Sequence, residues 1–328
     1  DKFGPVVSEG KVSLRKAILI TGPTATGKSE LAMRLYDRLG GEKSAQLISV
    51  DSAMVYKGLN IGTAKPSETT LKQYPHSLID VREPEENYSV ADFVRDADQI
   101  VNFTISESRT PILVGGTMLY IKCFRDGISQ LPSKNESVRK NLEDKIVDNG
   151  LDALYQELEA VDPEAAKNIH PHNRQRIIRA MEVFQITGKK ISTLWIEEPS
   201  ENVTKRLGCG LNIFAVLPKH KIDLDKRIND RFIGMLDGGF LEEVIALKRN
   251  TKLSLICPSM KSVGYRQAWR YLDGVTDRAG FVDEAIKATK SLAKKQMTWL
   301  RAWHDVETVL MGDDEDTYKR IEYSLEGG

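Results

Sequence analysis

The amino-acid sequence predicts an α/β protein, in which a parallel sheet is flanked by helices and carries an all-helical insertion domain. Short apolar runs rich in β-branched residues alternate with segments of helical spacing, as expected for a parallel sheet. These runs disappear between residues 132 and 199, where short charged amphipathic helices replace them. Because 328 residues exceed the usual size of a single hydrophobic core, we divide the chain into a core at 1–131 and 200–328 and an insertion at 132–199.

The first predicted strand leads into a glycine-rich phosphate-binding motif. An apolar run from Ala17 to Ile20 is followed by Gly22 to Ser29, which fits G-x-x-x-x-G-K-S/T, and helical spacing continues from Glu30 to Leu39. The glycines let backbone N–H groups turn toward an anion, and the helix N-terminus adds partial positive charge. Lys28 can neutralise phosphate oxygens and the Ser29 hydroxyl can bind Mg²⁺, so the order predicts a core like that of the P-loop NTPases. The predicted diphosphate-binding residues are Gly22, Pro23, Thr24, Ala25, Thr26, Gly27, Lys28 and Ser29.

A second strand, from Gln46 to Val50, delivers Asp51 and Ser52 to its carboxyl end, where ligands bind in an open parallel sheet. Asp51 is therefore a candidate metal ligand, general base or helix N-cap. The segment from Asp51 to Ser67 has no clean period, which indicates a functional loop built around short turns. The other predicted strands are 111–114, 212–217 and 306–310, and the other predicted helices include 89–107, 223–236, 240–248 and 282–303.

The third strand ends unusually. Nucleotide hydrolases end such a strand in an aspartate that helps to hold Mg²⁺, whereas here Gly115, Gly116 and Thr117 follow. This difference argues against standard ATP hydrolysis. The glycines indicate either a backbone that approaches a ligand closely, with one hydroxyl to orient it, or a simple tight turn.

Basic residues gather on three predicted helices. Arg227 and Arg231 share one helix face, where one of them could clamp a leaving anion or both could pair with nearby aspartates on the surface. A second helix presents Gln175 and Arg179 beside Arg176, on a face able to reach phosphates and base edges. From Ala285 to His304 the chain has five Lys or Arg residues, no acidic residue and two tryptophans, which suits either nucleic acid or a solvated face over a core.

Composition narrows the cellular setting. The formal net charge is zero, so nucleic-acid binding would depend on local basic patches. The three cysteines, Cys123, Cys209 and Cys257, are far apart and form no C-x-x-C motif, which favours a reducing cytoplasm. Residues 1–13 have no apolar core, so we expect no signal peptide, and no apolar run is long enough to span a bilayer. We expect a cytoplasmic monomer with no membrane partner.

Taken in order, several sequence blocks resemble the motifs of the tRNA dimethylallyltransferases, also called tRNA isopentenyltransferases. The blocks are GPTATGKS, DSAMVYKGLNIGTAKP, VGGTMLYIK, RQRIIRAMEVF, RINDRF, KSVGYRQAW and KKQMTWLRAW. The resemblance extends from Ala17 to Trp303, and its second and third blocks are the most specific. No zinc-finger pattern follows Trp303, so the chain is similar to the compact bacterial form.

The resemblance implies transfer of a dimethylallyl group from dimethylallyl diphosphate to N6 of the adenosine on the 3′ side of the anticodon. The glycine loop would then hold a diphosphate rather than a nucleoside triphosphate. Asp51 matches the family position of the general base, and Thr117 the position that orients the amine. Lys28 and Arg231 would stabilise charge on the leaving pyrophosphate, together with Mg²⁺ on Ser29.

The resemblance also implies that the helical insertion clamps the tRNA anticodon stem-loop, and that the target base leaves its stack to enter a channel toward the glycine loop. The matching tRNA-contact positions are Asp51, Ser52, Ala53, Met54, Thr117, Arg139, Gln175, Arg176, Ile177, Ile178, Arg179, Lys261, Ser262, Val263, Gly264, Tyr265, Arg266, Lys294, Lys295, Gln296, Met297, Thr298, Trp299, Leu300 and Arg301.

Three alternatives stay open at this stage. An adenylate isopentenyltransferase would prenylate free AMP, ADP or ATP, but it would need neither the insertion nor the basic helix at 287–301. A P-loop small-molecule kinase would be expected to end its third strand in an aspartate rather than in Gly115 and Gly116. A non-catalytic RNA-binding protein would not need the set of Lys28, Ser29, Asp51 and Thr117.

Overall fold

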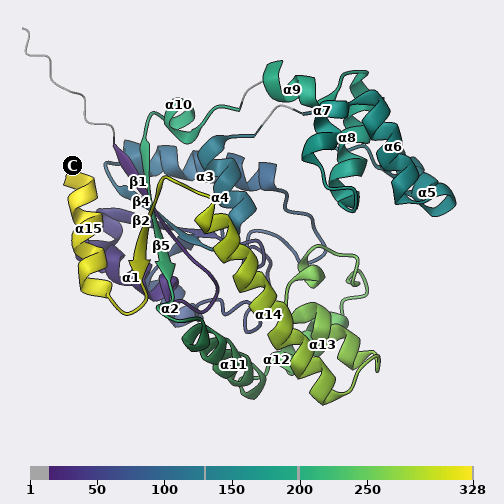
Figure 1. The fold of residues 1–328 in the computed structure, drawn as a ribbon. Helices are drawn as coiled ribbons and strands as arrows, with labels where there is room; N and C mark the ends of the chain where they lie inside the picture. The colour runs from purple at the N-terminus through teal and green to yellow at the C-terminus, as the bar shows by residue number, and fades with distance from the viewer. Residues whose placement is uncertain (1–14, 129–130, 198–199, 327–328) are drawn as a thin grey trace, which may run out of the picture. The chain divides into compact units, whose positions relative to one another are not determined.

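The computed structural model describes residues 15–128, 131–197 and 200–326 (Figure 1). Within these ranges a six-stranded sheet has the order β3-β2-β4-β1-β5-β6, and every neighbouring pair is parallel. The strands are β1 (Lys16–Thr21), β2 (Ala45–Val50), β3 (His76–Ser77), β4 (Thr110–Gly115), β5 (Gly210–Leu217) and β6 (Val306–Leu310). The predicted fold class, a P-loop-like parallel sheet flanked by helices, is confirmed.

The helices divide between two compact units. The first unit comprises residues 1–125 and 202–328, and the second comprises residues 126–201. The helices of the first unit are α1 (Lys28–Arg38), α2 (Glu68–Gln73), α3 (Val90–Ser106), α4 (Met118–Asp126), α10 (Val203–Leu207), α11 (Lys221–Asp237), α12 (Phe240–Lys248), α13 (Tyr265–Leu272), α14 (Arg278–Arg301) and α15 (Asp314–Glu326). The helices of the second unit are α5 (Glu136–Asn149), α6 (Leu151–Val161), α7 (Pro163–Asn168), α8 (Arg174–Thr187) and α9 (Ile191–Glu197). The boundaries drawn from sequence, at 132 and 199, differ from these by six and two residues.

Both faces of the sheet are buried. Along β1, Ala17 and Leu19 pack in one apolar cluster while Ile18 and Ile20 pack in another, because successive side chains of a strand point to opposite faces. The first cluster includes residues of α3 and α4, and the second includes residues of α1 and α15, on either side of the sheet in Figure 1. A sheet covered in this way explains the continuous apolar runs of the sequence.

The strand register places three loops at one edge of the sheet. Gly115, the last residue of β4, lies opposite Thr21 of β1 and Val50 of β2. The residues that follow these strands are Gly22, Asp51 and Gly116, so the glycine loop, the candidate carboxylate and the Gly-Gly-Thr turn leave the sheet side by side. This is the edge at which parallel sheets bind ligands.

The second unit has a hydrophobic core of its own. Leu142, Leu154 and Leu158 pack there against Ile177 and Met181 of α8. The helical spacing predicted for α8 is therefore correct, and its buried stripe belongs to this core. Among the described residues of the whole chain, no helix is both long and apolar enough to cross a membrane.

Candidate active site

The glycine loop between β1 and α1 has the geometry of an anion cradle. A Cβ on Gly22 would lie 2.4 Å from the carbonyl oxygen of Val216, so this position tolerates no side chain. Gly27 is the N-cap of α1 and has a φ of 85°, a conformation that glycine adopts without strain. The Thr26 hydroxyl and the Lys28 ammonium both donate to the carbonyl oxygen of Pro23, at 2.9 and 3.1 Å, which holds the loop curled over the helix N-terminus.

Two cations meet beside this loop. Burial lowers the pKa of Lys28 to about 8, the positive charge of Arg231 lowers it as well, and Asp51 acts in the opposite direction. Burial also lowers the pKa of Arg231, again opposed by Asp51. Arg231 comes from α11 and donates to the hydroxyl of Thr24 at 3.3 Å, inside the glycine loop. Within the described ranges neither cation forms an ion pair, so the loop carries positive charge that an anion would neutralise.

Asp51 caps a turn and also keeps one oxygen available. Its Oδ1 accepts backbone N–H bonds from Ala53 at 2.8 Å and Met54 at 3.1 Å, so the capping role considered from sequence is present. Its Oδ2 has no hydrogen-bond partner among the residues that the structure describes. One carboxylate therefore fixes the loop after β2 and presents a second oxygen as an acceptor near Lys28 and Arg231.

Thr117 joins the ends of two strands. Its backbone N–H donates to the carbonyl of Val50 at 3.3 Å, and its Oγ1 accepts from the backbone N–H of Ser52 at 3.0 Å. The hydroxyl also lies 3.4 Å from the Ser52 hydroxyl. These contacts hold Thr117 next to the residue that follows Asp51.

Gly115, the last residue of β4, and Gly116, which follows it, let other parts of the protein approach closely. A Cβ on Gly115 would lie 2.1 Å from the carbonyl oxygen of Val50, and one on Gly116 would lie 2.6 Å from the side chain of Gln296. Gln296 of α14 is buried, donates to the Gly116 carbonyl at 2.8 Å and accepts from the backbone N–H of Thr24 at 2.9 Å. It therefore ties the glycine loop to the Gly-Gly-Thr turn, a role that the sequence did not signal.

These elements surround a cavity of about 920 Å³. Lys28, Asp51, Thr117 and Arg231, which the sequence predicted as catalytic residues, all line it. Arg227 lines it too, and within the described ranges neither Arg227 nor Arg231 pairs with Asp223 or Asp230. Other lining residues include Thr24, Ala25, Gly27, Ser29, Ser52, Ala53, Met54, Gly62, Thr63, Ala64, Pro66, Lys261, Ser262, Val263, Gly264, Lys295, Gln296 and Trp299.

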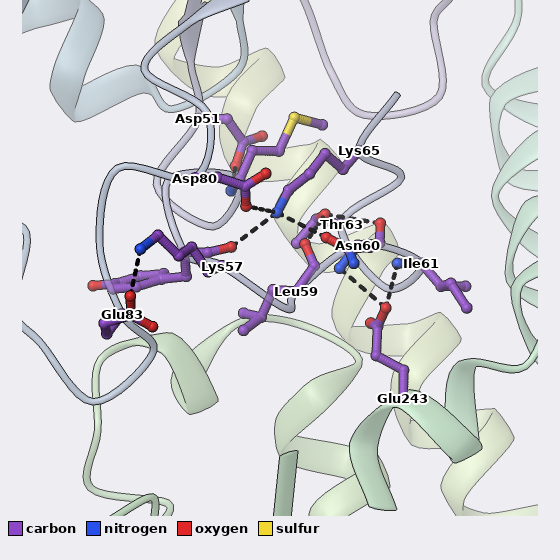
Figure 2. Close-up of polar contacts among 12 residues, drawn as sticks. Asp51, Lys57, Leu59, Asn60, Ile61, Thr63, Lys65, Asp80, Glu83 and Glu243 are labelled. Carbon is purple, nitrogen blue, oxygen red and sulfur yellow. Dashed lines mark hydrogen bonds and ion pairs between the residues drawn. The ribbon is translucent and has the colours of Figure 1, made fainter. Parts of the chain in front are cut away.

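The loop between β2 and α2 forms one wall of this cavity and is held by charged side chains (Figure 2). Lys65 is only 3% exposed, and its ammonium donates to the Tyr56 carbonyl at 2.8 Å and to Asn60 Oδ1 at 3.0 Å while it pairs with Asp80. Glu243 of α12 accepts from the backbone N–H groups at 60–62. The sequence suggested a functional loop here but did not single out Glu243.

The predicted tRNA contacts outside this cavity differ in how exposed their side chains are. The side chains of Ile177, Ile178, Tyr265 and Leu300 are buried, so they support their helices rather than present a surface. The side chains of Gln175, Arg176, Arg266, Lys294, Thr298 and Arg301 are exposed, and Met297 is half-buried. That any of these residues contacts tRNA stays a prediction.

Two further predicted contacts, Arg139 and Arg179 of the second unit, are paired with a buried carboxylate. Glu182 has a fully buried side chain and accepts from Arg139 at 2.9 and 3.1 Å and from Arg179 at 2.6 Å. Burial raises the pKa of Glu182, but the hydrogen bonds from both arginines outweigh it, so the net shift is downward. The carboxylate is thus held ionised beneath the two guanidinium groups.

A family model described as IPP transferase matches residues 54–303. The chain belongs to this family. The resemblance drawn from the sequence blocks is thereby confirmed. Over 305 residues the chain is 47% identical to the tRNA dimethylallyltransferase of Chromohalobacter salexigens, which covers 93% of this chain and 95% of that protein. It is 44% identical to tRNA dimethylallyltransferase 2 of Hahella chejuensis over 92% of this chain and 93% of that protein.

Solved structures agree with this assignment. The tRNA isopentenylpyrophosphate transferase of Bacillus halodurans matches with a TM-score of 0.68 at 31% identity, over 95% of this chain and 97% of that one. A eukaryotic dimethylallyltransferase acting on tRNA gives a TM-score of 0.74 at 23% identity, over 94% of this chain and 77% of that one. At that lower identity the likeness shows a shared fold.

Proposed function

We propose that this IPP transferase family member moves a dimethylallyl group from dimethylallyl diphosphate to N6 of the adenosine on the 3′ side of the anticodon in tRNA. The names of its relatives support the reaction class and the tRNA acceptor. The observation that carries the proposal is the cavity in which Lys28 and Arg231 face an anion-binding loop while a carboxylate, Asp51, lies beside them. A prenyl transfer needs these groups: cations for the departing diphosphate and a base for the attacking amine.

The glycine loop would bind the diphosphate of the donor. Backbone N–H groups at the N-terminus of α1 would contact its oxygens, and Lys28 and Arg231 would add charge. As the bond between the allylic carbon and oxygen breaks, negative charge grows on the diphosphate. Cations already fixed beside it stabilise that charge more than they stabilise the bound substrate, which lowers the barrier.

Asp51 and Thr117 would act on the acceptor. The adenine amine is a weak nucleophile because its lone pair is delocalised into the ring. The free Oδ2 of Asp51 would take the N6 proton as the new C–N bond forms, while Oδ1 keeps the loop in place. The Thr117 hydroxyl lies next to Ser52 and would orient the amine through a hydrogen bond.

The residues present suit a magnesium ion that is held mainly by its substrate. Among the described residues no group of three or more His, Cys, Asp or Glu side chains could hold a metal, and β4 ends in glycines. Ser29 in the first turn of α1 would supply one hydroxyl, and the diphosphate oxygens would supply further ligands. Bound there, the ion would neutralise charge on the diphosphate.

The test separates the role of Asp51 as general base from its role as a cap of the turn. Asp51→Asn retains an oxygen that accepts from Ala53 and Met54, because asparagine caps as well as aspartate, but it cannot take a proton. With labelled dimethylallyl diphosphate and unmodified tRNA, we expect the transfer rate to fall by about 10² to 10⁴-fold. Binding of inorganic diphosphate should change little. Asp51→Ala should lose the turn as well and lower thermal stability.

Two results would contradict the proposal. Label that enters free AMP or ATP, and not tRNA, would make the chain an adenylate isopentenyltransferase. An Asp51→Asn variant with wild-type transfer would leave Asp51 as a cap alone. The exposed substitution Asp237→Asn serves as a control for the loss of one carboxylate elsewhere on the same unit.

A further inference from the structure

Glu243 collects more backbone hydrogen bonds than its place on a surface helix would require. It is half-buried on α12, and its Oε2 accepts from the backbone N–H groups of Asn60 at 3.1 Å and Ile61 at 2.8 Å. Its Oε1 accepts from Gly62 at 3.3 Å and from the hydroxyl of Tyr265. Figure 2 shows the carboxylate directed at the backbone of Asn60 and Ile61. One carboxyl group thus gathers three consecutive N–H donors and a phenol.

Tyr265 makes this arrangement rigid. Its side chain is fully buried, and burial followed by the charge of Glu243 raises the pKa of its hydroxyl, so the hydroxyl stays protonated and keeps donating. The loop packs tightly on its ring. A Cβ on Gly62 would lie 2.3 Å from the ring of Phe240 and 2.6 Å from that of Tyr265. Glycine is needed here because the backbone itself lies against the two rings.

The opposite side of the same loop is held by Lys65, through the Tyr56 carbonyl, Asn60 and Asp80. Between these two anchors lie Gly62, Thr63 and Ala64, which line the cavity that also contains Lys28 and Asp51. Ala64 has a φ of 53°, which is uncommon for a residue with a side chain and persists only where its surroundings hold it. The wall therefore has a fixed shape set by Glu243 on one side and Lys65 on the other.

We propose that Glu243 is a positioning residue for the acceptor: it fixes the wall at 62–64 against the 264–265 turn, so that the RNA base entering the cavity is held in line with Asp51. This inference rests on the proposed tRNA prenyl transfer. Among the described residues, no hydrogen bond or ion pair joins Glu243 to the glycine loop or to Arg231, so its effect should be confined to the acceptor. A misplacement of about 1 Å at such a wall can cost on the order of a hundredfold in rate.

The experiment compares Glu243→Gln with Tyr265→Phe and with the control Glu242→Gln, whose side chain is exposed on the same helix. In Glu243→Gln the amide can accept on one side only and turns a donor toward the N–H groups or the phenol. We expect kcat/KM for tRNA to fall about tenfold or more in Glu243→Gln and less in Tyr265→Phe. The dissociation constant for inorganic diphosphate should stay within about twofold in all three variants, and amide exchange at Ile61 and Gly62 should accelerate in Glu243→Gln.

The outcomes are separable. Wild-type tRNA kinetics in Glu243→Gln, or an equal loss of diphosphate affinity, would overturn the positioning role. A fall in thermal stability without faster local exchange at 60–62 would reduce Glu243 to a general structural residue. If the wild-type protein transfers no label to tRNA, the proposed function fails by itself, before any variant is compared.

Discussion

Two pairs of cations in this protein have opposite surroundings. Lys28 and Arg231 lie at the glycine loop, and within the described ranges neither pairs with a carboxylate. Arg139 and Arg179 of the helical unit both pair with the buried carboxylate of Glu182. Burial lowers the pKa values of the first pair, and the positive charge of Arg231 lowers that of Lys28 further. In the second pair it is the carboxylate whose pKa is lowered, because its charge is compensated twice.

This contrast shows how the surroundings of a basic residue indicate whether it binds an anion. A buried cation without a partner costs stability, so its retention points to an anion that supplies the missing charge. An arginine on a buried glutamate already has its partner, and it offers only its remaining N–H groups to a ligand. Arg139 and Arg179 retain side-chain exposures of 25% and 24%, enough for such a second contact. The sequence assigned the first pair to the diphosphate and the second to tRNA, and the structure adds that only the second pair already has a buried carboxylate as partner.

The largest expected effect comes from removing an uncompensated cation. Lys28→Met keeps the length and apolar stem of the side chain but removes the charge that meets the diphosphate. We expect kcat/KM for the prenyl donor to fall by about 10³-fold, comparable to the loss of a transition-state donor elsewhere. Steady-state transfer to tRNA measures it, with the exposed Lys43→Met as the matched control. Near-normal activity in Lys28→Met would show that transfer does not depend on the charge of Lys28.

The second prediction concerns stability and has opposite signs in the two pairs. Lys28→Met should raise the free energy of unfolding of the ligand-free protein by about 1–2 kcal/mol at pH 7, because it removes an unpaired charge that is costly to bury. The gain stays this small because the Lys28 side chain is only half-buried. Arg139→Met should destabilise by about 1–3 kcal/mol, because it leaves Glu182 buried with one partner fewer. Denaturant unfolding of the ligand-free variants measures both. If both substitutions changed the free energy of unfolding in the same direction, the two pairs of cations would not differ in how their charge is compensated.

The sequence predicted most of the fold because its signals are local. The strand at 17–20 is found at Lys16–Thr21, the strand at 111–114 at Thr110–Gly115, and the cap at Ser89 forms the capping box of α3. β3 was missed because a strand of two residues, His76 and Ser77, has no measurable period. The glycine loop, Asp51 and Thr117 were recognisable because motif and strand end coincide.

What the sequence could not give were contacts made across the fold. Gln296 joins the glycine loop to Gly116 from 180 residues away, and Glu243 reaches the 60–62 backbone from a similar distance. Neither residue type has a motif for such a role. In the same way, nothing in the sequence revealed that Glu182 of α8 is paired with Arg139 of α5, 43 residues away.

The smallest expected effect is a pH dependence of diphosphate binding, which should arise from the pair Lys28 and Arg231 and not from Arg139 and Arg179. Because the pKa of Lys28 is lowered to about 8, the ligand-free protein loses that proton as the pH rises through 8, whereas a bound diphosphate favours the protonated form. Forming the complex therefore takes up a proton above pH 8. Because diphosphate has ionisations of its own in this pH range, the ratio of the wild-type affinity to that of Lys28→Met isolates the lysine. This ratio should be constant from pH 6.5 to about 7.5 and then fall by up to about tenfold per pH unit. Calorimetric titrations with inorganic diphosphate in buffers of different ionisation enthalpy give both the affinity and the protons taken up. Binding of an anticodon stem-loop should lack this step, since Lys28 is not among its proposed contacts. Lys28→Met should lose the step while Arg139→Met retains it, and a profile that is the same in both variants would assign the titration to another group and end the distinction between free and compensated cations.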